Sequence, residues 1–198
     1  MKKMISVLLA LVLSLGLCSA FAENAALPAY SWTGDDPVCA AVIKYMQDTD
    51  FGCYVPEGGV LIPTPIILKT DPAEVKEDTT EVTVYGNFWI FTYALKGKIL
   101  ETSSGCENPG ILKLEKKDGV WTVASAEFAG LGDDYIADIK KFAGGDKELE
   151  EEYFRSTGSE DSYLPQFQRA AVVEYVNANG LDIEAFQDPG WDPVSVID

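Results

Sequence analysis

Residues 81–128, EVTVYGNFWIFTYALKGKILETSSGCENPGILKLEKKDGVWTVASAEF, decide the fold. They contain strand-like runs separated by Lys96-Gly97, by a Gly/Ser/Asn/Pro-rich loop around Cys106 and by Asp118-Gly119; the runs are 81–95, 98–104, 110–117 and 120–128. A two-residue connection with glycine second is typical of a type I′ hairpin, because that turn matches the twist of the flanking strands. The stretch therefore predicts an antiparallel meander.

The first of these runs carries apolar side chains on both faces from Phe88 to Leu95. A strand with only one buried face alternates apolar and polar residues, whereas a strand covered on both faces does not. We therefore expect this strand in the middle of the sheet, with other elements packed on each side.

The segments before the meander read as a helix and an edge strand. Asp35 or Asp36 can cap a helix that runs from about Asp36 to Thr49, and Pro37 suits its first turn. Its apolar stripe consists of Val38, Ala41, Val42, Tyr45 and Thr49. The run VLIPTPIILKT, residues 60–70, contains two prolines that cannot donate to a ladder, so it predicts an edge or bulged strand.

After the meander the pattern becomes helical. Residues 133–145, 146–156 and 163–180 each have helical spacing, and the last segment ends at Asn179-Gly180. The final residues contain several prolines and aspartates but also Phe186 and Trp191, which predicts an ordered tail docked on the body. We divide the chain into residues 35–130 as an α+β core and 131–198 as a helical extension with this tail.

The N-terminus predicts export. MKK supplies a positive start, Ile5 to Leu17 is an apolar run of 13 residues, and SAFA ends in a signal-peptidase pattern. We expect a signal peptide over residues 1–22, cleaved after Ala22, and a polar leader over 23–34. The alternative is a lipoprotein acylated at Cys18, which LGLC disfavours because Leu17 is not small. Thirteen apolar residues are too few for a membrane-spanning helix.

Charge and composition exclude several functions. The formal charge is −17, and cleavage after Ala22 removes Lys2 and Lys3 and no acid, so the exported chain carries −19. This charge excludes nucleic acid as a partner. The chain has no histidine, so Ser-His-Asp and Cys-His nucleophiles and His-bearing zinc sites are impossible. We expect no metal site and no cofactor; the spacing of Asp188 and Asp192 is a weak calcium pattern.

The order of helix, proline-bearing strand and long curved meander resembles the NTF2-like (SnoaL-like) α+β cone. Within that fold, residues 88–130 and YVNANGLDIEAFQDPGWDP, residues 175–193, resemble a group of exported proteins of Gram-positive gut bacteria. The resemblance implies a strongly curved, NTF2-like or cystatin-like antiparallel sheet, with the N-terminal helix packed on it and a helical C-terminal extension. It implies no activity, because fold does not decide function.

The cysteines of the exported chain are Cys39, Cys53 and Cys106. Pairing Cys39 with Cys53 is awkward, because the predicted helix separates its two ends by about 15 Å and a disulfide needs Cα atoms within about 7 Å. Cys53 with Cys106 is therefore the preferred bond, and three free thiols are the alternative. A nucleophilic role for Cys106 is disfavoured, because Glu101 and Glu107 oppose thiolate formation.

The strand VTVYGNFWIFTYAL offers a candidate binding surface. One face carries rings with hydrogen-bonding groups, the composition of a ligand pocket: Tyr85, Asn87, Trp89, Phe91 and Tyr93. The other face, with Val82, Val84, Phe88 and Ile90, reads as core. The alternative interpretation of the first face is an ordinary sheet face covered by a helix.

Glu127 is the candidate general base. It follows Trp121 and Val123 at period 2, which predicts that its carboxylate points to the same buried face. NTF2-like isomerases and dehydratases resemble this arrangement in combining an acidic base with a phenol, here Tyr85 or Tyr93. Glu127 at a strand end facing water is the alternative.

The sequence is compatible with three functions. The first is a secreted, non-catalytic module that binds a small molecule or a peptide on the aromatic face. The second is a small lyase or isomerase that uses Glu127 with Tyr85 or Tyr93. The third is an inhibitor or immunity-type protein that binds a basic partner through its acidic surface. The sequence leaves the ligand and the oligomeric state open.

Overall fold

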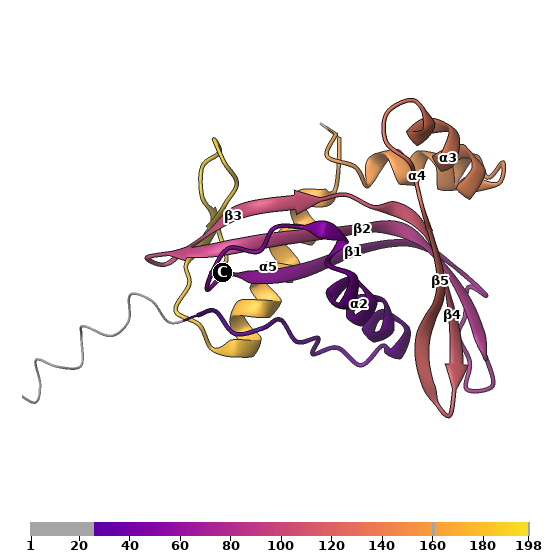
Figure 1. Cartoon of the computed structure of the whole chain (residues 1–198), viewed down its shortest axis with the longest axis horizontal. Helices are drawn as coiled ribbons and strands as arrows, with labels where there is room; N and C mark the ends of the chain where they lie inside the picture. Colours follow the sequence, from indigo (N-terminus) through magenta and orange to yellow (C-terminus); the bar gives the residue numbers. More distant parts are fainter. Residues whose placement is uncertain (1–25, 160, 198) are drawn as a thin grey trace, which may run out of the picture.

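The computed structural model describes residues 26–159 and 161–197. The predicted signal peptide, its cleavage after Ala22 and Cys18 lie outside these residues. Within them the chain is α+β, with one mixed sheet of seven strands and four α-helices (Figure 1). None of the helices in this part of the chain is long and apolar enough to span a membrane.

The long strand β2 (Glu81–Lys96) organises the sheet. On one side it pairs antiparallel with β1 (Val60–Asp71), which has a bulge between Ile67 and Lys69 and no other strand partner among the described residues. On the other side it pairs with both β3 (Ile99–Cys106) and β4 (Pro109–Lys117). The central position of β2 and the bulged edge position of β1 are thereby confirmed.

The predicted meander is wrong in one respect, because β3 and β4 do not pair with each other. β3 pairs with the second half of β2, from Ile90 to Lys96, and β4 pairs with the first half, from Glu81 to Asn87. The two strands form one long return strand, interrupted between Cys106 and Pro109. The turn-forming residues of this loop therefore make a break in the ladder and do not reverse the chain.

The strand β5 (Val120–Phe128) completes this end of the sheet by pairing with β4. Asp118 and Gly119 both have positive φ, at 52° and 81°, as the predicted type I′ turn requires. The β2–β3 turn differs, because Lys96 pairs with Ile99 and the turn residues are Gly97 and Lys98. Only Gly97 has positive φ, which is the sign pattern of a type II′ turn.

The C-terminal tail joins the sheet, so the expected antiparallel sheet is in fact mixed. β6 (Ala185–Gln187) pairs parallel with β3, and β7 (Val194–Ser195) pairs antiparallel with β6. The last helix returns the chain to the free edge of β3, where Phe186 is buried. The sheet is open, and the part that contains β4 and β5 bends away from the part that contains β3 (Figure 1).

One face of β2, here called the α2 face, is covered by α2 (Pro37–Thr49) and the short helix η1 (Asp50–Gly52). The Asp36 carboxylate caps α2 by accepting hydrogen bonds from two backbone N–H groups, which confirms the predicted helix start. The buried residues differ in part from the predicted stripe: Val38, Val42, Ile43 and Met46. Val38, Val42 and Met46 pack in the bend of the sheet against an apolar cluster, whereas Ile43 belongs to the cluster around Tyr93. The first cluster includes Val82, Val84, Phe88, Ile90, Leu112 and Trp121.

The opposite face of β2, here called the aromatic face, is covered by the C-terminal half of the chain. The helices α3 (Asp134–Ala143) and α4 (Lys147–Arg155) lie over Tyr85 and Ile111. The helix α5 (Leu164–Asn179) packs over Phe91 and Tyr93. The residues before α2 join this cluster through Leu27 and Tyr30, so the predicted polar leader contributes to the core.

Candidate functional site: a groove between β3, α5 and the C-terminal tail

The five predicted binding residues lie on one face of β2, but most of that face is filled core. Asn87, Phe91 and Tyr93 are buried, while Tyr85 and Trp89 are half-buried. Trp89 stacks on Phe91 with a ring-centroid distance of 5.5 Å. Tyr85 lies in the cluster beneath α3 and α4, with the Lys69 ammonium 5.9 Å from its ring centroid. Phe91 is the member of this set that lines the groove described below.

Asn87 and Trp89 hold the end of α4 on the sheet. Their side-chain N–H groups donate to the Ser156 carbonyl oxygen, at 3.2 Å from Asn87 and 3.0 Å from Trp89. Asn87 also donates to Glu107, which accepts from the Tyr135 hydroxyl. Asn87 Oδ1 is buried without a hydrogen-bond partner among the described residues. Asn87 and Trp89 therefore anchor the end of α4 to the sheet.

Glu127 does not point to the same face as Trp121. The pairing of β4 with β5 shifts register where Leu114 faces Val123 and Lys113 faces Ser125, which leaves Ala124 as an extra residue. A bulge of one residue reverses the alternation of side chains. Glu127 therefore stands opposite Ile111, with its side chain 55% exposed and ion-paired with Lys141 of α3. Ile111 in turn faces Tyr85, so it separates Glu127 from the nearer of the two candidate donors.

A groove of about 420 Å³ opens between β3, the start of α5 and the turn after β6. Its apolar lining includes Phe91, Leu164, Pro165 and Trp191, and its polar lining includes Thr102, Gln168 and Asp188. Trp191 forms part of the rim, because its side chain is 74% exposed. Apolar walls with a few placed polar groups are typical of sites for small ligands.

The polar lining is held by a network of side chains from four elements. Gln168 donates to the Tyr93 hydroxyl oxygen at 3.2 Å and to Asp188 Oδ1 at 3.1 Å. Thr102 donates to the same Asp188 oxygen at 2.5 Å. Burial raises the pKa of the Tyr93 phenol, while hydrogen bonds with Gln168 and Thr102 act in the opposite direction. The phenol therefore remains neutral at ordinary pH and braces Gln168.

A second hollow of about 230 Å³ adjoins the groove and shares Thr102, Asp188 and Pro189 with it. Glu101 also lines this hollow and forms an ion pair of 2.8 Å with Lys96. The Asp188 carboxylate therefore stands where the two hollows meet.

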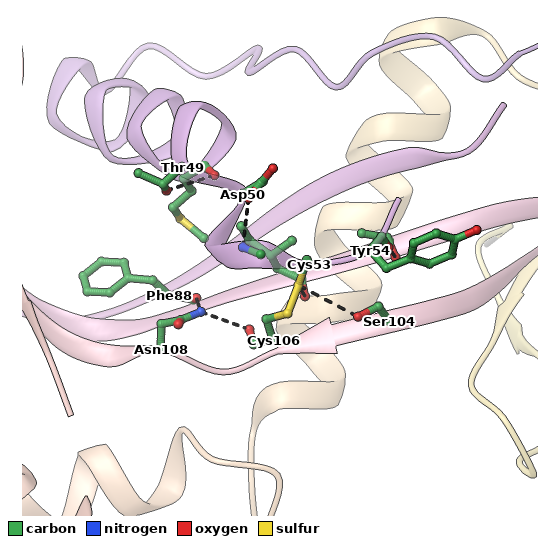
Figure 2. Close-up of a disulfide and its surroundings, with 12 residues drawn as sticks. Thr49, Asp50, Cys53, Tyr54, Phe88, Ser104, Cys106 and Asn108 are labelled. Atoms are coloured by element: carbon green, nitrogen blue, oxygen red, sulfur yellow. Dashed lines mark hydrogen bonds between the residues drawn. A yellow bond between two sulfur atoms is a disulfide. The ribbon is translucent and has the colours of Figure 1, made fainter. Parts of the chain in front are cut away.

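The disulfide between Cys53 and Cys106 confirms the predicted pairing, with a Cα–Cα distance of 6.2 Å (Figure 2). It ties the segment after α2 to the end of β3 on the α2 face. In this bonded state Cys106 has no free thiol to act as a nucleophile. Cys39 is the free cysteine of the described residues, and burial, followed by the charges of Asp36 and Glu174, raises the pKa of its thiol to about 11.

Thr102, Gln168 and Asp188 were not predicted from the sequence as one group. Gln168 carried a readable signal, because it is a polar residue within the buried stripe of α5, between Leu164 and Val172. A polar group at a buried position needs a hydrogen-bond partner. Neither Thr102 nor Asp188 had such a signal, because their meeting depends on the parallel pairing of the tail with β3.

Comparison with models of protein families finds no matching family, and comparisons with curated proteins and with solved structures find no significant match.

Proposed function

We propose that this protein is an exported, non-catalytic binding module that holds a small amphipathic molecule or a peptide in the groove between β3, α5 and the tail. One observation carries the proposal: an apolar wall meets a polar network already braced by Tyr93, Thr102 and Gln168. Side chains that are locked before the ligand arrives lose little entropy on binding. The proposed site therefore lies at the edge of the aromatic face of β2, whereas the sequence predicted it on the face itself.

The lyase or isomerase alternative receives less support. Glu127 is exposed and ion-paired with Lys141, Ile111 lies between it and Tyr85, and Tyr93 is fully buried. A general base must reach the proton that it removes. The inhibitor or immunity-type alternative rests on the net charge alone. Net charge bears on solubility and association in general and does not identify a binding surface.

The NTF2-like cone and the relation to exported proteins of Gram-positive gut bacteria are part of this proposal. A helix in the bend of a curved sheet supports it, whereas the parallel β6 and the collinear β3 and β4 depart from a simple meander. The Cys53–Cys106 disulfide supports export, because such bonds persist in oxidising compartments.

Ligand-observed NMR with a library of small amphipathic compounds tests the proposed function, with hits mapped on ¹⁵N-labelled protein. We expect hits to shift the backbone amides of Thr102, Gly105 and Gln168, and to bind more weakly to Trp191→Ala. Val120→Ala is the matched control, because Val120 is also an exposed apolar residue but does not line the groove. Hits that shift amides elsewhere, and that bind Trp191→Ala and the wild type equally, would contradict the proposal.

A further inference from the structure

The Asp188 carboxylate has one oxygen occupied and one available. Both hydrogen bonds that it accepts, from Thr102 and Gln168, end on Oδ1. Among the described residues no donor contacts Oδ2, and Asp188 takes part in no ion pair. An ionised carboxylate has about four acceptor positions. The network therefore orients Asp188 and leaves half of its acceptor capacity free.

Among the described residues, none that lines the groove or the adjoining hollow gives Asp188 a compensating positive charge. The residues that line the groove and the adjoining hollow include Asp188 and Glu101 and no lysine or arginine. Glu101 is neutralised by Lys96, whereas Asp188 has no such partner within the described chain. An anionic ligand would meet an unopposed carboxylate, and a neutral ligand would gain one hydrogen bond. A cation would gain a charge-assisted hydrogen bond, which is roughly twice as strong as a neutral one.

A turn connects Asp188 to Trp191, and both residues line the groove. Asp188, Pro189, Gly190 and Trp191 form a β-turn in which the Trp191 N–H donates to the Asp188 carbonyl oxygen at 3.1 Å. Proline in the second position and Gly190 at φ 83° in the third are the signature of a type II turn. Gln187 donates to the Trp191 carbonyl oxygen at 2.7 Å and closes the same loop. The residues that carry the carboxylate and the indole therefore belong to one hydrogen-bonded turn at the mouth of the groove.

We infer that the ligand of this groove is a cationic amphiphile, whose ammonium or guanidinium group binds Asp188 Oδ2 while its apolar body packs between Phe91 and Trp191. This inference rests on the proposed function and names the class of ligand. The face of an indole ring attracts a cation, which adds to the attraction of the carboxylate. A small amine and the basic side chain of a peptide share this chemistry.

Three probes of nearly equal size isolate the charge: 3-phenylpropylamine, 3-phenylpropan-1-ol and 3-phenylpropanoate. Calorimetric titration of the wild type should give the amine an affinity at least about tenfold above that of the alcohol and the carboxylate, the gain expected of a charge-assisted bond. Asp188→Asn keeps an acceptor oxygen for Thr102 and Gln168 but removes the charge. It should remove the preference for the amine and leave the alcohol unchanged within about twofold.

Asp192→Asn is the matched control, because it removes the same charge from the same tail and Asp192 lines neither hollow. It should bind all three probes like the wild type. Acetyl-phenylalanyl-lysine amide presents the same ammonium group from a peptide. Tighter binding of this compound than of the free amine assigns the ligand to peptides, and the reverse order assigns it to small amines.

The two proposals fail in different ways. If all three probes bind equally and all are weakened by Trp191→Ala, the inferred cation is wrong and the groove remains a binding site. If no probe binds the wild type, or if binding is unaffected by both Trp191→Ala and Asp188→Asn, the groove is not the site and the proposed function is wrong as well.

Discussion

The two faces of β2 are built differently. The α2 face holds Val82, Val84, Phe88 and Ile90 beneath a helix that precedes β2 in the chain, and it is joined by the disulfide. The aromatic face is covered mainly by α3, α4, α5 and the tail, all of which follow β5 in the chain, and Leu27 and Tyr30 from the segment before α2 add to this cover. This face contains buried polar groups on Asn87, Tyr93 and Gln168, whereas the buried side chains that β2 places on the α2 face are apolar except for Thr92, whose hydroxyl donates to the Tyr54 carbonyl oxygen.

This difference shows where a binding site can form. On the α2 face the buried polar side chain of β2, Thr92, already donates to a backbone carbonyl oxygen, so it is not free to recognise a ligand. The aromatic face needs several elements to cover it, and their polar side chains meet at the seams between them. The groove lies at one such seam, where β3, α5 and the turn after β6 come together.

The largest loss of stability is expected on the α2 face. Phe88 is fully buried and packs edge-to-face on Phe128 at 6.1 Å. Phe88→Ala should lower the free energy of unfolding by about 3–5 kcal/mol, because it removes a ring and leaves a cavity. Urea unfolding measures the change. If instead the loss is no greater than for an exposed residue such as Val120→Ala, the α2 face is not the stable core that the packing indicates.

Removal of the disulfide should have the next largest effect. Cys53 and Cys106 are 53 residues apart in the chain, so their bond restricts the unfolded state strongly. Replacement of both by alanine should lower the free energy of unfolding by about 2–4 kcal/mol. Cys39→Ala serves as the control, since Cys39 is unbonded. Equal stability of the double variant and this control would show that the bond contributes little.

Tyr93→Phe examines the polar network of the aromatic face. At neutral pH it should lower the free energy of unfolding by about 1 kcal/mol, the value of one hydrogen bond. Burial raises the pKa of this phenol in the folded chain, whereas an unfolded phenol ionises near about pH 10. The contribution of the Tyr93 hydroxyl to the free energy of unfolding is therefore fully present below the pKa of an unfolded phenol. It is lost as the pH rises toward the pKa of Tyr93 in the folded chain.

The difference in stability between the wild type and Tyr93→Phe should accordingly shrink above about pH 10. Tyr54→Phe is the control, because Tyr54 is 68% exposed. Urea unfolding at several alkaline pH values measures both variants. A constant difference across this range would mean that the Tyr93 phenol ionises alike in the folded and unfolded chains.

Trp191→Ala should have the smallest effect on stability and a clear effect on binding. The side chain is 74% exposed, so the free energy of unfolding should change by no more than about 0.5 kcal/mol. The substitution nevertheless removes one wall of the groove. A loss of stability as large as that of Phe88→Ala would assign Trp191 to the core and erase the contrast between the two faces.

Much of the local structure could be predicted from the sequence. Asp36 and Pro37 mark a helix start because a carboxylate can accept from the free N–H groups of the first turn. The Asp118-Gly119 turn followed from its residue types. The division of β2 into an apolar face and an aromatic face followed from the period of two, and the cysteine pairing followed from the length of one helix.

The candidate site was not predictable in the same way. Glu127 was expected on a buried face, but an extra residue at Ala124 reverses the alternation in β5. No residue type near Ala124 predicts this bulge, because the position of the bulge depends on the register between β4 and β5. Similarly, the loop around Cys106 has the composition of a hairpin turn, yet the ladder of β2 continues across it into β4.

The four α-helices, the strands β1 to β5 and the two faces of β2 could be predicted from the sequence alone, because caps, turns and side-chain period are properties of neighbouring residues. The elements that cover each face, and hence the meeting of Tyr93, Thr102, Gln168 and Asp188, are seen only in the folded chain. These four residues belong to β2, β3, α5 and the tail. Their meeting depends on long-range strand pairing and helix packing, whose energies no short stretch of sequence contains.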